Sequence, residues 1–153
     1  MGFKKTTRNL DFADLAMATC LEQNPCIELI EQVSANINWA RVESVLLSHY
    51  TVGTSEEGAR AYPPLMLFKC LLLQKWFRIP SDPELENQIT DRLSFKTFLG
   101  LSFSQPAPDH STFSRFRSRL PKEAMDAINS EILRQFEQQG VIKPAIKHVH
   151  YAV

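Results

Sequence analysis

The chain has 153 residues, of which 44% are hydrophobic, so it is long enough to form one domain with a buried core. Its 17 basic and 17 acidic residues cancel, which excludes a uniformly basic nucleic-acid-binding protein. The longest apolar stretch, residues 65–77, is interrupted by Lys69, Gln74 and Lys75 and falls short of the roughly 20 apolar residues that span a bilayer. No apolar run follows the basic N-terminus, so we expect neither a secretory signal nor a membrane partner, and cytoplasmic localisation.

Apolar periodicity and helix-capping residues predict an all-α fold, a compact domain of about seven or eight helices. We expect a mobile arm over residues 1–9, a helical domain over residues 10–142 and a tail over residues 143–153. No convincing strand alternation precedes Val141. The expected helices, in chain order, cover residues 11–22, 25–33, 38–46, 63–77, 82–93, 95–99, 109–120 and 122–139. A polar loop is expected over residues 52–60.

Individual residues sharpen these boundaries. Asn24 and Asn38 are good helix N-caps, and either Ser81 or Asp82 caps the helix that follows. The helix after Pro63 is apolar nearly all round, which is typical of a central buried helix. The apolar faces of the later helices are expected to pack on this central helix. They predict one buried group, which consists of Leu67, Leu71, Phe98, Phe113 and Phe116. The three cysteines, Cys20, Cys26 and Cys70, form no Cys-x-x-Cys unit and are expected to be buried, reduced thiols.

The most informative segment is Pro106 to Leu120, in which Asp109 is the expected N-cap of a basic helix. At about 100° per residue, Phe113, Phe116 and Leu120 share one face. The opposite face carries Ser111, Arg115, Ser118 and Arg119. Hydroxyls and arginines opposite an apolar wedge favour a helix that packs on one side and touches DNA on the other, although a merely solvated basic face has the same pattern.

Charge is concentrated around this helix. Residues 92–122 carry six basic residues and one acidic residue, a net charge of +5, whereas residues 1–60 carry five and eight, a net charge of −3. A local positive patch is what contact with phosphate requires. Residues 81–120 resemble a helix-turn-helix with a turn longer than the usual 3–4 residues.

Several motifs in one order carry a family resemblance. They are Tyr-Pro-Pro-Leu-Met-Leu-Phe-Lys-Cys from Tyr62, Ser-Asp-Pro-Glu-Leu-Glu from Ser81, Asp-Arg-Leu-Ser-Phe-Lys from Asp91, and Pro-Asp-His-Ser-Thr-Phe-Ser-Arg-Phe-Arg from Pro108. From about Tyr62 to Ile142 the chain resembles the N-terminal domain of bacterial insertion-sequence transposases of the IS-five group. The resemblance implies a helical DNA-binding domain placed before an RNase H-like catalytic domain, in which a DDE triad uses Mg²⁺.

The chain departs from that family pattern after its last helix. No acidic residue follows Glu137, and Pro144 interrupts the expected catalytic strand. Two-metal phosphoryl transfer needs converging carboxylates, which a single helix does not supply. We therefore expect a truncated transposase that lacks the catalytic domain, is not an enzyme, and has no catalytic residues, metal ligands or cofactor. His148 and His150 are read as a chance pair.

These observations predict a DNA-binding domain that recognises the terminal inverted repeats of a transposon in double-stranded DNA. The residues expected to contact DNA are His110, Ser111, Thr112, Arg115, Arg117, Ser118, Arg119, Lys122, Arg92 and Lys96. Two alternatives remain at this point: a protein-interaction module that pairs with itself or with full-length transposase and inhibits it, and a folded remnant without function. The acidic first 60 residues and the zero net charge favour the interaction module.

Overall fold

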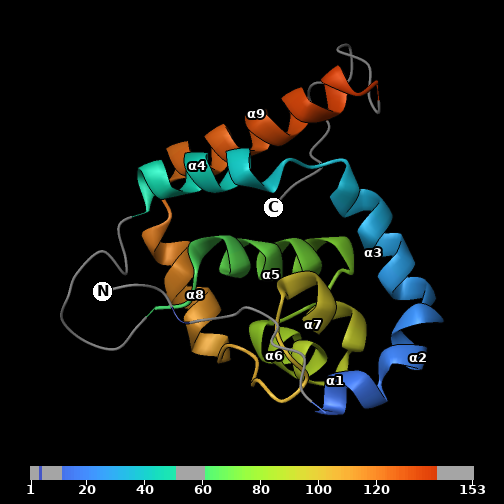
Figure 1. The fold of residues 1–153 in the computed structure, drawn as a ribbon. Helices are drawn as coiled ribbons and strands as arrows, with labels where there is room; N and C mark the ends of the chain where they lie inside the picture. Colours follow the sequence, from blue (N-terminus) through green and yellow to red (C-terminus); the bar gives the residue numbers. More distant parts are fainter. Residues whose placement is uncertain (1–3, 5–11, 51–60, 141–153) are drawn as a thin grey trace.

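The structure is a computed structural model that describes residue 4, residues 12–50 and residues 61–140. Over these residues it has nine helices and no strand, which confirms the all-α prediction (Figure 1). The helices are α1 (Phe12–Ala16), α2 (Ala18–Glu22), α3 (Pro25–Ala35), α4 (Trp39–His49), α5 (Pro64–Trp76), α6 (Asp82–Asp91), α7 (Leu93–Leu99), α8 (His110–Arg119) and α9 (Lys122–Gln138). The helix expected over residues 11–22 is divided at Met17 into α1 and α2.

Three predicted segments fall largely or wholly outside the described residues: the arm over residues 1–9, the loop over residues 52–60 and the tail over residues 143–153, which includes the two histidines. Lys4 is the one described residue of the arm. Its backbone N–H donates to the carbonyl of Ala61 at 2.9 Å, and its ammonium lies 4.1 Å from the centroid of the Tyr62 ring. Lys4 therefore contacts the segment that leads into α5.

Side-chain caps begin four of the helices where the sequence places them. The Asn24 side chain accepts from the N–H groups of Cys26 and Ile27 at 3.0 and 3.3 Å. Asn38, Ser81 and Asp109 cap α4, α6 and α8 in the same way. Each cap satisfies an N–H group that has no partner within its own helix, so these boundaries are decided locally.

Helix α5 lies at the centre of the molecule (Figure 1). Helices α4 and α9 pack along each other above it, α6 and α7 lie below it, and α3 and α8 flank it on opposite sides (Figure 1). Phe68, Cys70, Leu72 and Leu73 of α5 are fully buried, as expected for a helix that is apolar nearly all round. None of the described helices is long and apolar enough to cross a membrane.

Four of the five residues predicted to be buried together are buried in one core: Leu67, Leu71, Phe113 and Phe116. Phe98 is half-buried at the edge of this core, where its ring centroid lies 5.8 Å from that of Trp39. Phe95 is the fully buried aromatic residue of α7 instead. Both rings lie on the apolar side of a short helix, and the position of α5 decides which of them is covered.

Helical spacing places Phe12 and Leu15 near each other on the first helix, and both are exposed. Their exposed fractions are 85% and 65%, whereas the intervening Asp14 is buried. Helices α1 and α2 pack on each other and make little contact with the other described helices. The prediction for the thiols is wrong for two of the three, because Cys20 is exposed and Cys26 half-buried, while Cys70 is buried. Burial raises the pKa of the Cys70 thiol.

Helix α5 ends in a left-handed residue that is not glycine. Arg78 has φ 51°, and the N–H of Ile79 reaches back to the carbonyl of Gln74 at 2.9 Å. This is the Schellman geometry, in which glycine is the usual residue. A residue with a side chain pays about 1–2 kcal/mol to adopt this left-handed conformation. Glycine avoids this strain, but it loses more conformational entropy on folding, which cancels part of the gain.

We therefore expect Arg78→Gly to raise the free energy of unfolding by about 0.5–1 kcal/mol, measured by urea denaturation. Arg78→Ala is the control, because it removes the guanidinium and keeps the strained backbone. Equal stabilisation by both variants would show that the arginine side chain, not the backbone, is unfavourable.

Candidate DNA interface

Helix α8 presents two faces of opposite character. Phe113, Phe116 and Leu120 are buried at 0%, 1% and 7% exposure, as the periodicity predicts. The ring of Phe116 packs edge-on against Tyr50 with the centroids 5.1 Å apart. The opposite face is exposed and consists of Ser111, Ser114, Arg115, Ser118 and Arg119. This set is called the outer face of α8 below. Ser114 was not among the predicted contacts, although the same helical spacing places it there.

Arg117 lies at the side of α8 and is already bonded to neighbouring helices. One guanidinium nitrogen lies 2.8 Å from a carboxylate oxygen of Asp82, and another donates to the side-chain oxygen of Gln74. The Gln74 amide in turn donates to Asp82 at 3.1 Å. Arg117 therefore holds α8 against α5 and α6, and its charge is paired within the protein.

Arg115 and Arg119 remain on the outer face. Among the described residues neither forms an ion pair with a carboxylate. Arg115 donates to the Thr112 hydroxyl at 3.4 Å, which is a weak contact. Burial raises the pKa of the Tyr50 hydroxyl, and the charge and hydrogen bond of the nearby Arg119 partly offset that rise. Lys122 begins α9 and is also exposed, so three cations lie on the surface at this end of the molecule.

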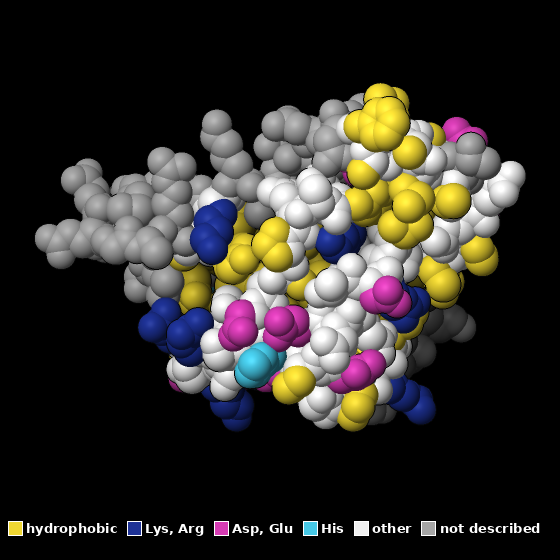
Figure 2. Space-filling view, turned by 90° about the horizontal axis from the view of Figure 1, so that it is seen from below, with side chains coloured by type: hydrophobic (Ala, Val, Ile, Leu, Met, Phe, Trp, Pro, Cys, Tyr) yellow, Lys and Arg dark blue, Asp and Glu magenta, His cyan; other side chains and the backbone are white. Residues whose placement is uncertain are grey.

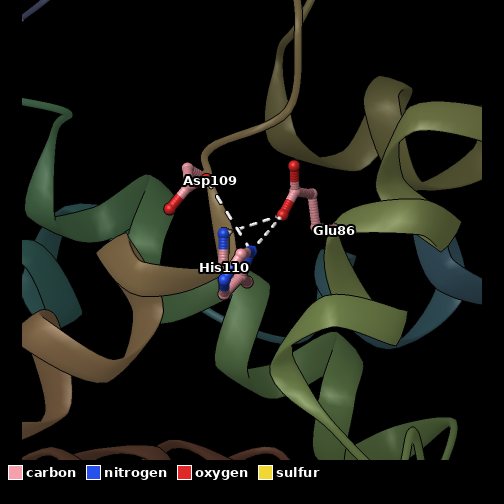
Figure 3. A group of neighbouring side chains, drawn as sticks. All are labelled: Glu86, Asp109 and His110. Atoms are coloured by element: carbon pink, nitrogen blue, oxygen red, sulfur yellow. Dashed lines mark hydrogen bonds and ion pairs between the residues drawn. The ribbon is translucent and has the colours of Figure 1, made fainter.

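The first turn of α8 is surrounded by acidic groups (Figure 3). A carboxylate oxygen of Glu86 on α6 accepts from both the backbone N–H and Nδ1 of His110, each at 2.9 Å. Asp109 accepts from the backbone N–H of Ser111 at 2.8 Å and from its hydroxyl. These bonds hold the pKa of Asp109 below its usual range, so it is ionised at neutral pH.

This arrangement uses the amide donors that a phosphate would otherwise find at a helix N-terminus. It also places two carboxylates where an incoming phosphate would be repelled. His110 and Ser111 are exposed, but their hydrogen-bond donors are engaged in docking and capping the helix. Ligand atoms of Glu86, Asp109 and His110 all lie within 4.8 Å of one another, but the bonds described here account for their closeness.

Lys96 is buried and Arg92 is half-buried, and both lie at α7 and not on the outer face of α8. The Arg92 guanidinium stacks 4.1 Å from the Phe95 ring centroid and 4.7 Å from that of Phe77. Lys96 is 5% exposed, and its ammonium donates to the carbonyls of Phe103 and Gln105 at 3.0 and 2.7 Å. Desolvation lowers its pKa. The contacts of both cations lie around α7, so neither belongs to the outer face of α8.

The bond between His110 and Glu86 predicts a pH-dependent stability. The hydrogen bond to Glu86, followed by the charge of Asp109, raises the pKa of His110 above its ordinary value of about 6.5. A raised folded-state pKa means that the protonated ring stabilises the fold. That contribution is complete below about pH 6.5 and is lost as the pH rises through the folded-state pKa.

Thermal unfolding between mildly acidic and mildly alkaline pH should show this loss, and His110→Gln should remove it. His49→Gln is the matched control, because His49 is an exposed histidine at the end of α4. An unchanged pH profile in His110→Gln would assign the dependence to other groups.

The connection from α7 to α8 spans residues 100–109. It is longer than the 3–4-residue turn of a standard helix-turn-helix, and α8 packs mainly on α6. The fold thus defines a class of small helical domain in which one arginine-bearing helix is held outward by a buried aromatic wedge.

The chain belongs to the family described as Transposase domain (DUF772), whose model it matches over residues 19–119, more than half of its length. No curated protein and no solved structure matches the chain.

Proposed function

We propose that this transposase-family domain binds double-stranded DNA through the outer face of α8, and that its targets are the ends of a transposon. The observation that carries the proposal is the pairing of exposed, unneutralised Arg115 and Arg119 with a fully buried wedge on the same helix. A helix anchored in this way holds the backbone of its arginines in a fixed position on the surface. Rigid presentation lowers the entropy cost of binding.

The side chains of the outer face can both read bases and contact the phosphate backbone of DNA. An arginine can donate two hydrogen bonds to guanine in the major groove, and serine hydroxyls can donate to phosphate oxygens. The acidic first turn directs the contact to the second half of α8, where Arg115, Ser118 and Arg119 lie. Lys122 extends the positive surface beyond the helix end.

The electrostatic contribution to DNA affinity should be small. Of the six basic residues in 92–122, Lys96 is buried, Arg92 is half-buried and stacked on aromatic rings, and Arg117 is paired with Asp82. Three exposed cations remain. If each neutralises one phosphate, the slope of log affinity against log salt should be about −3.

The direct test is an anisotropy titration of the 153-residue chain with labelled duplexes. One duplex should carry the terminal repeat of an insertion sequence and the other the same bases in scrambled order, each at several salt concentrations. We expect tighter binding to the repeat and a shallow salt slope. We also expect both duplexes to stay intact when Mg²⁺ is added, because the acidic residues of α9 are distributed along a single helix. If the chain does not bind DNA at low salt, the outer face is only a solvated surface and the proposal is wrong.

A further inference from the structure

Apolar side chains are exposed at one end of the molecule, far along the chain from α8. Six large apolar side chains are exposed in the described part of the chain, and five of them lie between Phe12 and Val33. They are Phe12 at 85%, Leu15 at 65%, Met17 at 40%, Leu29 at 54% and Val33 at 37%. Figure 2 shows apolar side chains gathered on the right, the side on which Figure 1 places α1 to α3. These five side chains are called the α1–α3 surface.

The geometry of α3 explains why part of this surface is left open. Ile27 and Ile30 point into the fold, where α3 packs on α7. Leu29 and Val33 lie one turn apart on an adjoining flank, to which no described helix is closely packed. Ordinary surface helices place polar residues on such a flank.

The size of the α1–α3 surface matches half of a dimer interface. From their exposed fractions, the five side chains leave on the order of 500 Å² of apolar area in water, near the top of the range for the largest patch on a monomer. A standard interface buries about 800 Å² on each partner, and homodimer interfaces are about 65% apolar. Such an interface needs about 500 Å² of apolar area per subunit.

The charge around the α1–α3 surface limits the kinds of partner that can bind there. Residues 12–40 contain four acidic residues, namely Asp14, Glu22, Glu28 and Glu31, and no lysine, arginine or histidine. DNA and anionic membranes would be repelled from such a surface. Apolar contact is not directional, so an apolar patch of this size can be covered by the same patch of a second copy.

We propose that the α1–α3 surface is a self-association interface, at which a second copy of the chain covers Phe12, Leu15 and Leu29 about a two-fold axis. The interface uses helices that the outer face of α8 does not, so the proposal does not rest on DNA binding. Glu22, Glu28 and Glu31 are exposed on the same helices and repel their counterparts in the partner. Because salt screens this repulsion, dimerisation should strengthen with salt, whereas DNA binding weakens with it.

Sedimentation equilibrium of the full chain, from low micromolar to submillimolar concentration and at low and high NaCl, tests the proposal. We expect a monomer–dimer equilibrium that shifts toward the dimer at high NaCl. Leu29→Lys should weaken dimerisation about tenfold or more. The matched control is Leu47→Lys, because Leu47 is a 42% exposed leucine on α4 and should tolerate the change.

Circular dichroism of each variant confirms that it is folded, and Phe12→Ser provides a second disruption of the surface on a different helix. A chain that stays monomeric at every concentration in both salts would overturn the proposal. Equal weakening by Leu29→Lys and Leu47→Lys would overturn it as well. Retained DNA binding by Leu29→Lys would separate the two surfaces, since loss of dimerisation alone leaves the outer face of α8 intact.

Discussion

Replacing Phe113 with alanine is expected to lower the free energy of unfolding by about 3–5 kcal/mol. The Phe113 ring is fully buried in the core that α5 and α8 share. Its removal loses the transfer free energy of the ring and leaves a cavity that the surrounding helices cannot fill by collapsing. The same change loosens the wedge that holds the outer face of α8, so DNA binding should weaken even under conditions in which the variant is folded.

Urea denaturation monitored by circular dichroism measures the effect. Phe12→Ala is the matched control, because the Phe12 ring is 85% exposed and its removal should change stability by no more than about 0.5 kcal/mol at low protein concentration. A cost under about 1 kcal/mol for Phe113→Ala would mean that α8 is not anchored by its aromatic wedge.

Replacing Arg115 or Arg119 with alanine is expected to reduce affinity for terminal-repeat DNA without changing the fold. An arginine that reads guanine should cost about 1–3 kcal/mol of binding free energy and relax sequence preference. An arginine that contacts only phosphate should weaken all duplexes alike and reduce the salt slope by about 1. The two variants, titrated separately against repeat and scrambled duplexes, assign one of these roles to each residue.

Arg41→Ala is the matched control, because Arg41 is an exposed arginine on α4, near the far end of α9. Its removal should leave affinity unchanged. Arg117→Ala serves a different purpose: it frees Asp82 and should lower stability before it affects binding. If both outer-face variants bind DNA like the parent chain, the proposed interface is wrong.

Local chemistry made the helix boundaries predictable. Asn24, Asn38 and Asp109 act on N–H groups two or three residues away, so their effect does not depend on the rest of the fold. The two faces of α8 were predictable for a similar reason, since helical geometry alone places Phe113 and Phe116 opposite Ser118. The all-α class follows from the same regularities, repeated along the chain.

Periodicity does not say which apolar faces are covered, and there the predictions failed. Phe12 and Leu15 have the spacing of a core face, yet no described helix is packed over them. Phe98 was predicted to be in the core, yet it is Phe95, three residues earlier on the same short helix, that is fully buried. Covering a face requires a neighbour from a distant part of the chain, which no local pattern encodes.

For the charges of the candidate DNA interface, the sequence and the tertiary structure again decided different things. The sequence by itself determined that basic residues concentrate between residues 92 and 122 and that two arginines face away from the wedge. Only the tertiary structure decided which cations stay available: Arg117 meets Asp82 across 35 residues of chain, and Lys96 is buried against carbonyls of the connection that follows α7. A charge is neutralised by whatever group the fold brings within a few ångströms, and that distance is set by packing and not by position in the sequence.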